Sequence, residues 1–191
     1  AGTMKRMKQW VRDVHEEGIE PHPGPRFISK NYNGLVSPKT REAFFLKILS
    51  EHKKDPIGAV LIQEHHWKKE LAQQAEVEAG KLKLLLIAAP IPQNQTRGGT
   101  AVAIPYDAIE LKKDETLHEA ITRMTNTASR SKSGRTTSIS AIVNSRYLRL
   151  TSAYAHSDLH ADQRPAYFTK ELGPRLTRNT ILGIDANCVP D

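Results

Sequence analysis

Short, almost wholly apolar segments recur along this chain and restrict its fold more than any other feature does. Apolar runs of this length, bounded by turn-forming residues, are typical of strands that are buried on both faces of a sheet. Four such strands are predicted, at residues 57–63, 83–89, 98–105 and 179–185. Buried strands need helices or a second sheet packed against them, so we expect an α/β domain.

The segments between the apolar strands have the spacing of helices. Ser37 can cap a helix that starts at Pro38, and the apolar residues that follow recur at i, i+4 spacing. Residues 67–79 also present one apolar face, and Asp162 could cap a helix over residues 163–172.

Three further strands complete the predicted sheets. Residues 27–34 form a strand that ends in a glycine, and residues 135–143 and 147–154 face each other across a three-residue connection, Asn144-Ser145-Arg146. A hairpin pairs its strands antiparallel, whereas alternating strands and helices favour parallel pairs. The prediction is therefore a layered α/β fold with mixed pairing.

The composition excludes several classes of protein. A chain of 191 residues is long enough for one domain with its own core. No apolar run approaches the roughly 20 residues that cross a bilayer, and residues 1–20 lack the apolar stretch of a secretory signal. The single cysteine, Cys188, excludes an intramolecular disulfide and a cysteine-based zinc module. We expect an intracellular protein, nuclear or cytoplasmic, that is neither secreted nor membrane-bound.

The net charge of +7 is confined to one part of the chain. Residues 120–180 contain ten Lys and Arg residues but only three Asp and Glu residues, and the rest of the chain is balanced. Such a basic segment attracts polyanions by releasing their counterions. A solvated basic surface without a partner would have the same composition, so charge alone leaves nucleic-acid binding open.

Within this basic segment, residues 125–138 are rich in Ser, Thr and Arg (TNTASRSKSGRTTS). The composition predicts a loop, which is either a mobile surface loop or a basic loop that contacts phosphates. In the second case the nucleic-acid-binding residues are Arg130, Lys132 and Arg135.

Polar residues that can bind metals and phosphates follow several of the predicted strands: Asn31, Glu64, Tyr154, Asp185 and Asn187. A carboxylate at the end of a buried strand is costly unless it is paired or bound to a metal. Glu64 and Asp185 could therefore meet at one sheet edge and form an oxygen site suited to Mg²⁺. Amide and phenol groups beside them would donate to phosphate oxygens, which fits metal-assisted hydrolysis of a phosphodiester.

Each of these residues also has a structural interpretation. Glu64 could pair with a lysine of the next helix, and Tyr154 could belong to the core. The His65-His66 pair could lie at a helix start, because adjacent residues seldom bind one metal. Residues 185–187 could be a turn, since Asp and Asn favour turns. From residue types alone, a shared site and separate structural roles remain equally open.

Six motifs occur in the order seen in a known family: ISKNYNGL (28–35), LIQEHHW (61–67), GGTAVAI (98–104), RLTSAYAHSD (149–158), QRPAYF (163–168) and ILGIDAN (181–187). With them, residues 27–191 resemble the endonuclease/exonuclease/phosphatase superfamily. The resemblance is strongest to the apurinic-type endonuclease domains of non-LTR (LINE-type) retrotransposons.

The resemblance implies a four-layer α/β sandwich of two packed mixed sheets, with the site at one end. It implies that Glu64 and Asn31 bind a catalytic metal, Mg²⁺ or Mn²⁺, and that Tyr154 contacts the scissile phosphate. Asp185 would orient the attacking water, and Asn187 would hold phosphate. The substrate would be target DNA, which the domain nicks by hydrolysis.

The sequence departs from the family pattern in three places. Lys30 stands where the family commonly has a Trp or another apolar residue. His156 stands where the family has a proline, and the Ser-Asp-His-type motif at the end of the family domain does not occur before Asp191. The resemblance then implies that residues 27–191 are the N-terminal two-thirds of such a domain, a sandwich incomplete at its C-terminus. Because the family histidine is essential, we expect this chain alone not to cleave DNA at a useful rate.

Residues 1–26 are basic and then rich in proline, and we expect them to form a disordered leader. Their segment GIEPHPGP resembles a degenerate ribosome-skipping peptide, which some retroelements carry before this domain. A chance Pro/Gly linker is the alternative. The retroelement interpretation places a reverse transcriptase domain downstream in the same polyprotein.

Two other functions are compatible with the sequence. One is a non-catalytic basic remnant that binds nucleic acid or another partner. The other is a phosphatase of the same superfamily that acts on a lipid or inositol phosphate. The basic segment and the leader favour the endonuclease over the phosphatase.

Overall fold

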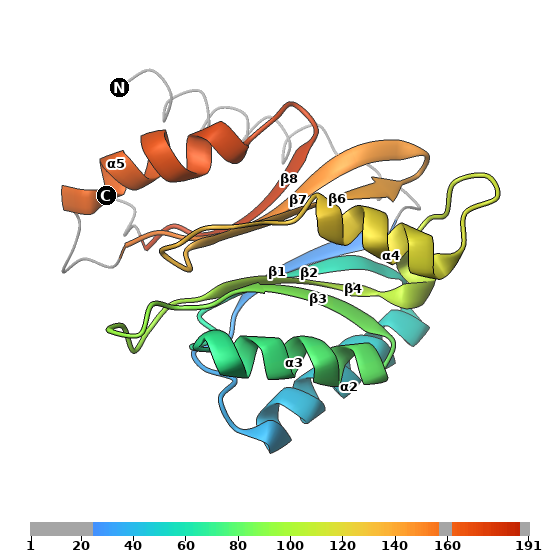
Figure 1. The fold of residues 1–191 in the computed structure, drawn as a ribbon, viewed down its shortest axis with the longest axis horizontal. Coiled ribbons are helices and arrows are strands. Elements are labelled where there is room, and N and C mark those ends of the chain that lie inside the picture. Colours follow the sequence, from blue (N-terminus) through green and yellow to red (C-terminus); the bar gives the residue numbers. More distant parts are fainter. Residues whose placement is uncertain (1–24, 157–161, 188–191) are drawn as a thin grey trace, which may run out of the picture.

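The structure of the chain is a computed structural model in which residues 25–156 and 162–187 are described. Over these residues the chain forms two mixed sheets of four strands each, packed face to face with helices on their outer faces (Figure 1). The predicted α/β class and four-layer sandwich are thereby confirmed. Residues 1–24, nearly all of the expected leader, lie outside the described residues.

The first sheet consists of β1 (Arg26–Asn31), β2 (Ile57–Gln63), β3 (Leu84–Ala89) and β4 (Thr100–Pro105), in the order β1-β2-β4-β3. β1 and β2 are parallel, and β4 is antiparallel to both β2 and β3. Every residue of β2, β3 and β4 is buried, as their apolar sequences predict. β4 starts two residues later than expected, because Gly98 and Gly99 have φ angles of 105° and 88°, which a strand does not use.

Two helices, α2 (Pro38–Lys54) and α3 (Lys69–Lys81), cover the outer face of the first sheet. α2 begins as predicted, because the Ser37 side chain accepts a hydrogen bond from the Thr40 N–H and Pro38 occupies the first turn. α3 starts two residues later than predicted. His66 has a φ of 63°, which no right-handed helix allows, so the chain reaches helical geometry only at Lys69.

The second sheet consists of β5 (Ser129–Arg130), β6 (Thr136–Val143), β7 (Arg146–Tyr154) and β8 (Thr180–Asp185), in that order. β5, β6 and β7 are antiparallel, and β8 is parallel to β7. The predicted hairpin is present, but its connection has two residues rather than three, because Val143 pairs with Arg146. Asn144 and Ser145 have φ angles of 49° and 60°, and two left-handed residues are what a type I′ hairpin turn requires.

The loop predicted over residues 125–138 is present only in part, at residues 127–128 and 131–135. The other residues of this stretch belong to the end of α4 (Leu117–Asn126), the short strand β5 and the start of β6. The hydroxyl-rich part is buried: Thr137 Oγ1 donates to the Thr100 carbonyl at 2.7 Å, and Ser138 Oγ lies 3.0 Å from Thr151 Oγ1. Ser and Thr here satisfy strand-interior hydrogen bonds, so their abundance does not indicate a loop.

The predicted helix over residues 163–172 is also corrected. The structure has a single turn α5 (Arg164–Ala166), a π-helical turn η3 (Tyr167–Leu172) and a 3₁₀ turn η4 (Gly173–Arg175). Gln163 stands at the N-terminus without a side-chain cap, so Asp162 is not the cap. The wider π turn places the Tyr167 hydroxyl 3.1 Å from the Arg135 carbonyl, to which it donates. This helical segment covers the outer face of β7 and β8.

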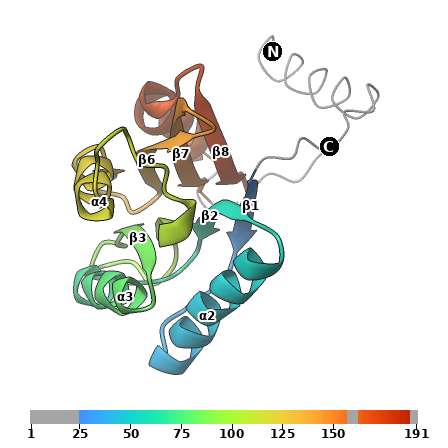
Figure 2. The same cartoon turned by 90° about the vertical axis from the view of Figure 1, so that its right-hand side faces the viewer.

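The space between the sheets is filled by apolar side chains from both of them, and α4 closes it on the side of β3 and β6 (Figure 2). β8 crosses the first sheet at close range, because Gly183 has no side chain. A Cβ there would lie 2.6 Å from the Ser29 hydroxyl and 2.7 Å from Leu61 Cβ. No helix in the described part of the chain combines the length and apolar character of a membrane span.

Candidate active site

The parallel pairs of both sheets end at the same end of the sandwich. β1 and β2 finish side by side at Asn31 and Gln63, and β7 and β8 finish side by side at Tyr154 and Asp185. Glu64 is the next residue after β2. Close packing of the two sheets therefore gathers the polar residues that the sequence places at strand ends.

The Asn31 side chain joins the two carboxylates. Its Nδ2 donates to Glu64 Oε2 at 2.7 Å and to Asp185 Oδ2 at 2.6 Å. Its Oδ1 accepts the Asn33 N–H at 2.9 Å, which fixes the orientation of the amide. One amide thus holds two acidic side chains from different sheets beside each other without neutralising either of them.

The Tyr154 hydroxyl contacts the other oxygen of the same carboxylate. It donates to Glu64 Oε1 at 2.5 Å, a short hydrogen bond to a charged acceptor. Burial of the phenol, followed by the hydrogen bond and the charge of Glu64, raises the pKa of Tyr154 to about 12. Tyr154 is therefore a protonated donor at neutral pH.

Asn187 completes the group of five predicted residues. Its backbone N–H donates to Asp185 Oδ1 at 3.1 Å, and its side-chain amide donates to the Ala155 carbonyl at 2.9 Å. Asn187 has a φ of 47°, a conformation that Asn adopts more readily than most residues. The structure thus brings Asn31, Glu64, Tyr154, Asp185 and Asn187 together at one end of the sandwich.

Glu64 leaves β2 through a strained turn. Glu64 and His66 both have left-handed φ angles, 57° and 63°, on either side of the fully buried His65. Backbone strain of this kind persists only where the surrounding contacts determine it, and it is common at functional sites.

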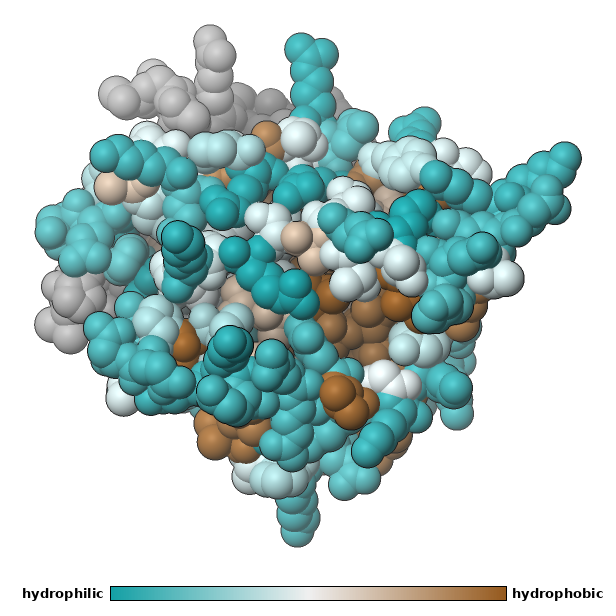
Figure 3. Space-filling model, in the orientation of Figure 1, coloured by the Kyte–Doolittle hydropathy of each residue, from teal (hydrophilic) through white to brown (hydrophobic). Residues whose placement is uncertain are grey.

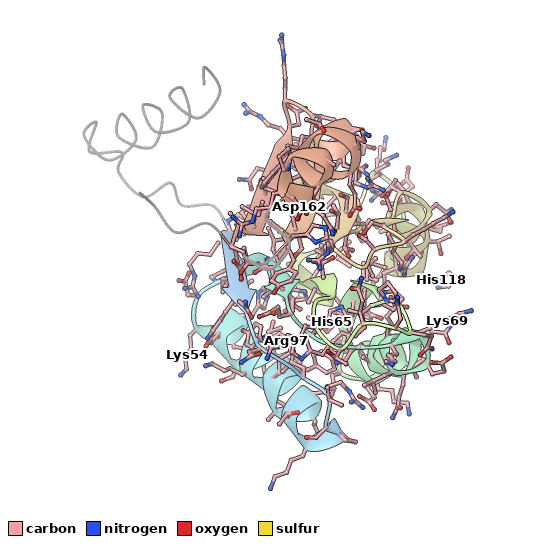
Figure 4. The ribbon with its side chains drawn as sticks, turned by 90° about the vertical axis from the view of Figure 1, so that its left-hand side faces the viewer. Lys54, His65, Lys69, Arg97, His118 and Asp162 are labelled. Carbon is pink, nitrogen blue, oxygen red and sulfur yellow. The ribbon has the colours of Figure 1, made fainter. Side chains whose placement is uncertain are left out.

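His65 supplies those contacts. Its Nδ1 accepts the Trp67 N–H at 2.9 Å, its Nε2 lies 3.2 Å from the Thr100 carbonyl, and its ring stacks on Trp67 at 4.2 Å. Burial lowers the pKa of His65 to about 3, so the ring is neutral. Because Nδ1 accepts a hydrogen bond, the single ring proton is on Nε2, which donates it to the Thr100 carbonyl. Figure 4 shows His65 inside the molecule, whereas His118 lies at its periphery. His65 is an internal support for the turn that carries Glu64.

His66 lies in the site itself, which sequence reasoning did not predict. Its Nε2 is 3.9 Å from Glu64 Oε1, and only 16% of its side chain is exposed. The residue type was visible in the sequence, but the left-handed turn that directs the ring towards Glu64 has no sequence signal.

A buried polar network lies beneath the carboxylates. Gln63 Nε2 donates to Ser152 Oγ at 3.0 Å, and Ser152 Oγ donates to the Ile62 carbonyl at 2.7 Å. These bonds join β2 to β7, and so fix the position of Glu64 relative to Tyr154 across the two sheets.

The three predicted nucleic-acid-binding residues lie in different surroundings. Arg135 is buried beneath Tyr154: its guanidinium lies 5.3 Å from the phenol ring centre, and its NH1 donates to the Ala155 carbonyl at 3.3 Å. Burial lowers the pKa of Arg135 from its usual value. Arg130 forms an ion pair with Glu76 of α3 at 2.9 Å.

Lys132 is exposed, as Arg130 is, whereas Arg135 is buried. Lys132 lines a cleft of about 620 Å³ together with Lys170 and Arg175, and His156 borders the same cleft. His156 follows Tyr154 by two residues, so the cleft adjoins the candidate site.

The donor set at the strand ends suits a hard divalent cation. Carboxylate and amide oxygens are the ligands that Mg²⁺ and Mn²⁺ prefer, and such ions keep several waters. Among the described residues no three His, Cys, Asp or Glu side chains gather closely enough to form a metal cage by themselves. Among the described residues, His66 Nε2 is a buried ring nitrogen without a hydrogen-bond partner. The site therefore has a nitrogen next to Glu64 that is available as a metal ligand.

No protein-family model matches the chain, and no curated protein is similar to it in sequence. Solved structures do match. The AP endonuclease LMAP from Leishmania major superposes with a TM-score of 0.52 at 15% identity, over 84% of this chain and 49% of that protein. A humanized TDP2 from D. rerio gives a TM-score of 0.51 at 12% identity, over 88% of this chain and 68% of that protein.

The chain has the endonuclease/exonuclease/phosphatase fold. At these identities the likeness establishes the fold alone, and the chain spans about half the length of LMAP. The endonuclease domain of TRAS1, a telomere-specific non-LTR retrotransposon, also matches, at 14% identity over 87% of this chain and 60% of that domain. The TM-score of that superposition is 0.44.

Proposed function

We propose that this protein hydrolyses phosphodiester bonds of DNA with the help of a divalent metal ion. The observation that carries the proposal is the Asn31 amide, which holds Glu64 and Asp185 together beside the Tyr154 phenol. Two acids, two amides and a phenol at one sheet end are the groups that metal-assisted phosphodiester hydrolysis needs. The fold supports the proposal, because solved structures with this fold include an AP endonuclease.

Glu64 and Asn31 would hold the metal, Mg²⁺ or Mn²⁺. When bound, such an ion offsets negative charge on the phosphoryl group. Glu64 is prepared for this role, because Asn31 and Tyr154 each donate to one of its oxygens and leave the other lone pairs free. Asn31 would use the second lone pair of Oδ1, since Asn33 occupies only one.

Asp185 would orient the attacking water and accept its proton. Its two oxygens are held by Asn31 and by the Asn187 N–H, so the carboxylate cannot rotate freely. The Tyr154 hydroxyl donates to Glu64 and the Asn187 N–H donates to Asp185, and both residues would donate to phosphoryl oxygens as charge develops there.

The DNA backbone would lie in the cleft next to the site. Lys132 and Lys170 are exposed, and together with Arg175 they line this cleft of about 620 Å³. Of the basic residues predicted from the sequence, Lys132 has the free, exposed position that a phosphate contact needs. Arg135 is buried and Arg130 is paired with Glu76, so Lys170 and Arg175 take their place in the proposal.

The origin in a retrotransposon polyprotein, with a reverse transcriptase domain downstream, is part of the same proposal. It is supported by the sequence motifs and by the ribosome-skipping-like segment before them. The coding sequence that follows residue 191 tests it directly. A Ser-Asp-His-type motif followed by a reverse transcriptase pattern is the expected result, and a different downstream domain would remove this part of the proposal.

Nicking of supercoiled plasmid tests the activity, measured in single turnover with Mg²⁺ or Mn²⁺. Glu64→Gln and Asp185→Asn should each lower the rate by about 100- to 1,000-fold, because each removes a charge at the reacting centre. Glu70→Gln, at an exposed carboxylate of α3, is the matched control and should leave the rate unchanged. Nicking that is equal in all four proteins would refute the assignment.

The same assay tests the expectation that this chain alone is slow. The family histidine is not among residues 1–191, so we expect a longer chain that includes a Ser-Asp-His-type motif to nick about 100- to 1,000-fold faster. Equal, Glu64-dependent rates for the two chains would show that this motif is dispensable here.

A further inference from the structure

His66 has a ring nitrogen whose environment the proposed mechanism does not explain. Its Nε2 is buried and has no hydrogen-bond partner among the described residues. Leaving a polar atom unpaired in the interior typically costs folding free energy, so such an atom needs an explanation, and an ion at the site is one of the recognised explanations.

The ring is held firmly in this position. The His66 N–H donates to the Gly98 carbonyl at 2.9 Å, and its φ of 63° turns the side chain back towards Glu64. Gly34 makes room for the ring, because a Cβ at that position would lie 3.1 Å from His66 Nδ1. The Gly34 N–H in turn donates to the Glu64 carbonyl at 2.7 Å. Through Gly34, the positions of Glu64 and His66 are fixed relative to each other.

The distance between His66 Nε2 and Glu64 Oε1 is 3.9 Å. That is too long for a hydrogen bond between the two atoms. It is a suitable distance for two ligands of one cation, because donors at bond lengths of about 2.1 Å from a shared ion lie roughly 3 to 4 Å apart.

We propose that His66 Nε2 is a ligand of the same divalent ion that Glu64 binds, and that this nitrogen makes the site prefer Mn²⁺ to Mg²⁺. The inference rests on the proposed function, of which it specifies the metal. Mg²⁺ favours sites made wholly of oxygen, whereas imidazole nitrogen is a good ligand for transition metals. Glu64 and Asn31 would each supply an oxygen and His66 a nitrogen, and water and a substrate phosphate would fill the other positions.

The strained turn gives a second, independent reason. Two left-handed residues two positions apart direct Glu64 and His66 into the same space, while His65 between them points into the core. If the turn served Glu64 alone, His66 would not need a φ of 63°. A pair of ligands on one rigid turn is a means of fixing metal geometry before the metal binds.

The test is pulsed electron paramagnetic resonance of Mn²⁺ bound to the full chain, which detects a nitrogen nucleus bonded directly to the ion. We expect nitrogen coupling in the wild type, its loss in His66→Gln, and no change in His118→Gln, a control at an exposed histidine of α4. Glu64→Gln should weaken Mn²⁺ binding altogether. Circular dichroism of each variant confirms that it is folded.

Competition between the two metals tests the selectivity. In His66→Gln the preference for Mn²⁺ over Mg²⁺ should fall by about 10- to 100-fold, while Mg²⁺ binding stays close to that of the wild type. Mn²⁺ that binds through Glu64 without nitrogen coupling would overturn the inference and leave the proposed function standing. Failure of Mn²⁺ to bind at Glu64 would overturn the inference together with the metal site, whereas the nicking assay judges the hydrolysis separately.

Discussion

Asn31 holds side by side two acidic groups that would otherwise repel each other. Glu64 and Asp185 come from different sheets, and each accepts one bond from the same amide nitrogen. Like charges this close destabilise the folded protein unless donors or a cation lie between them. The amide supplies the donors without adding charge, and it leaves lone pairs of both carboxylates open to a metal.

Tyr154→Phe tests the other donor at this carboxylate. The change removes the 2.5 Å bond to Glu64 Oε1 and should lower the rate of nicking by about 100-fold. It should also change the dependence of stability on pH. Native Tyr154 keeps its proton up to a pKa of about 12, whereas the unfolded tyrosine loses it near 10, so this contribution is present below pH 10 and is lost as the pH rises towards 12.

The predicted loss of stability with rising pH is checked by measuring the free energy of unfolding in urea between pH 8 and pH 11. The wild type should lose stability over that range, and Tyr154→Phe should lose less, because its unfolding no longer releases this proton. A steeper loss in the variant than in the wild type would contradict the assigned pKa.

Gly99 shows how little space the turn beneath Glu64 leaves. A Cβ there would lie 2.3 Å from the His65 ring, and the residue has a φ of 88°. We expect Gly99→Ala to lower the free energy of unfolding by at least about 2 kcal/mol. Gly80→Ala is the matched control, because Gly80 lies in α3 and its nearest neighbour, the Tyr106 hydroxyl, would be 3.6 Å away. That change should stabilise the protein by up to about 1 kcal/mol. Equal effects of the two changes would show that the His65 contact is not tight.

At the residue scale, the structure brings together the five polar residues that the sequence singled out, whereas their electrostatic surroundings were not predicted. Residue types alone left a shared site and separate structural roles equally open, and the family resemblance selected Asn31, Glu64, Tyr154, Asp185 and Asn187. Burial of Arg135 was not predictable, because an arginine in a Ser/Thr-rich segment has the same sequence signature whether it contacts phosphate or packs under a phenol.

At the scale of elements, the edge strand β3 is protected by two side chains that sequence reasoning assigned elsewhere or left out. The Ala88 N–H donates to Glu76 Oε1, and the Ala88 carbonyl accepts from Arg130 Nε, both at 2.9 Å. Arg130 also donates to Glu76 Oε1 at 2.9 Å. Figure 3 shows apolar side chains in a hollow at the level of β3, where a cleft of about 480 Å³ runs past Val77 and residues 84–87.

Removal of the Glu76 carboxylate should expose the edge of β3. Glu76→Ala leaves the Ala88 N–H without its acceptor, so we expect a loss of about 1 to 3 kcal/mol in the free energy of unfolding and self-association at high concentration. Glu70→Ala changes an exposed carboxylate of the same helix and is the control. Sedimentation and urea unfolding measure the two effects. A Glu76→Ala variant that is as stable and as monomeric as the control would show that Glu76 does not protect the edge of β3.

Elements with long apolar runs were predictable to within one or two residues, and the others were not. β2 matches its predicted bounds because its seven residues are all buried and the flanking segments are not apolar. α4 was missed although Thr116 and Glu119 form a capping box. Its apolar face is short, and the Ser/Thr-rich stretch after it suggested a loop. The π turn in η3 arises from tertiary contacts of Tyr167, which no local pattern encodes.

At the scale of the whole molecule, the site exists because two sheets approach closely at one end. Gly183 removes the side chain that would keep β8 away from Ser29 and Leu61, and the Gln63–Ser152 bond fixes the sheets beside it. The sequence predicts the two sheets separately, from apolar runs and a hairpin. Their relative placement follows from this long-range contact, so the sequence predicted which residues would meet but not which atoms would touch.

The cleft beside the site leads to a prediction about DNA binding by the whole molecule. Lys132 and Lys170 are exposed in the cleft, whereas Lys53 and Lys54 are exposed at the end of α2, next to the start of β2 and therefore at the opposite end from the site. Both pairs contribute two charges, so net charge is matched. We expect Lys132→Gln with Lys170→Gln to weaken duplex binding and to reduce the slope of log affinity against log salt by about 2, because two counterion-releasing contacts are lost.

The same pair of changes at Lys53 and Lys54 should leave that slope almost unchanged. Fluorescence anisotropy with a labelled duplex, over a series of salt concentrations and in a Glu64→Gln background, measures binding without cleavage. Substitution of Arg130 or Arg135 cannot serve this purpose, because those side chains hold the edge of β3 and the backbone after Tyr154. If the two lysine pairs have equal effects, DNA is attracted by total charge alone. If only the α2 pair has an effect, the backbone of the DNA lies away from the carboxylates, and the assignment of hydrolysis to this end of the sandwich fails with it.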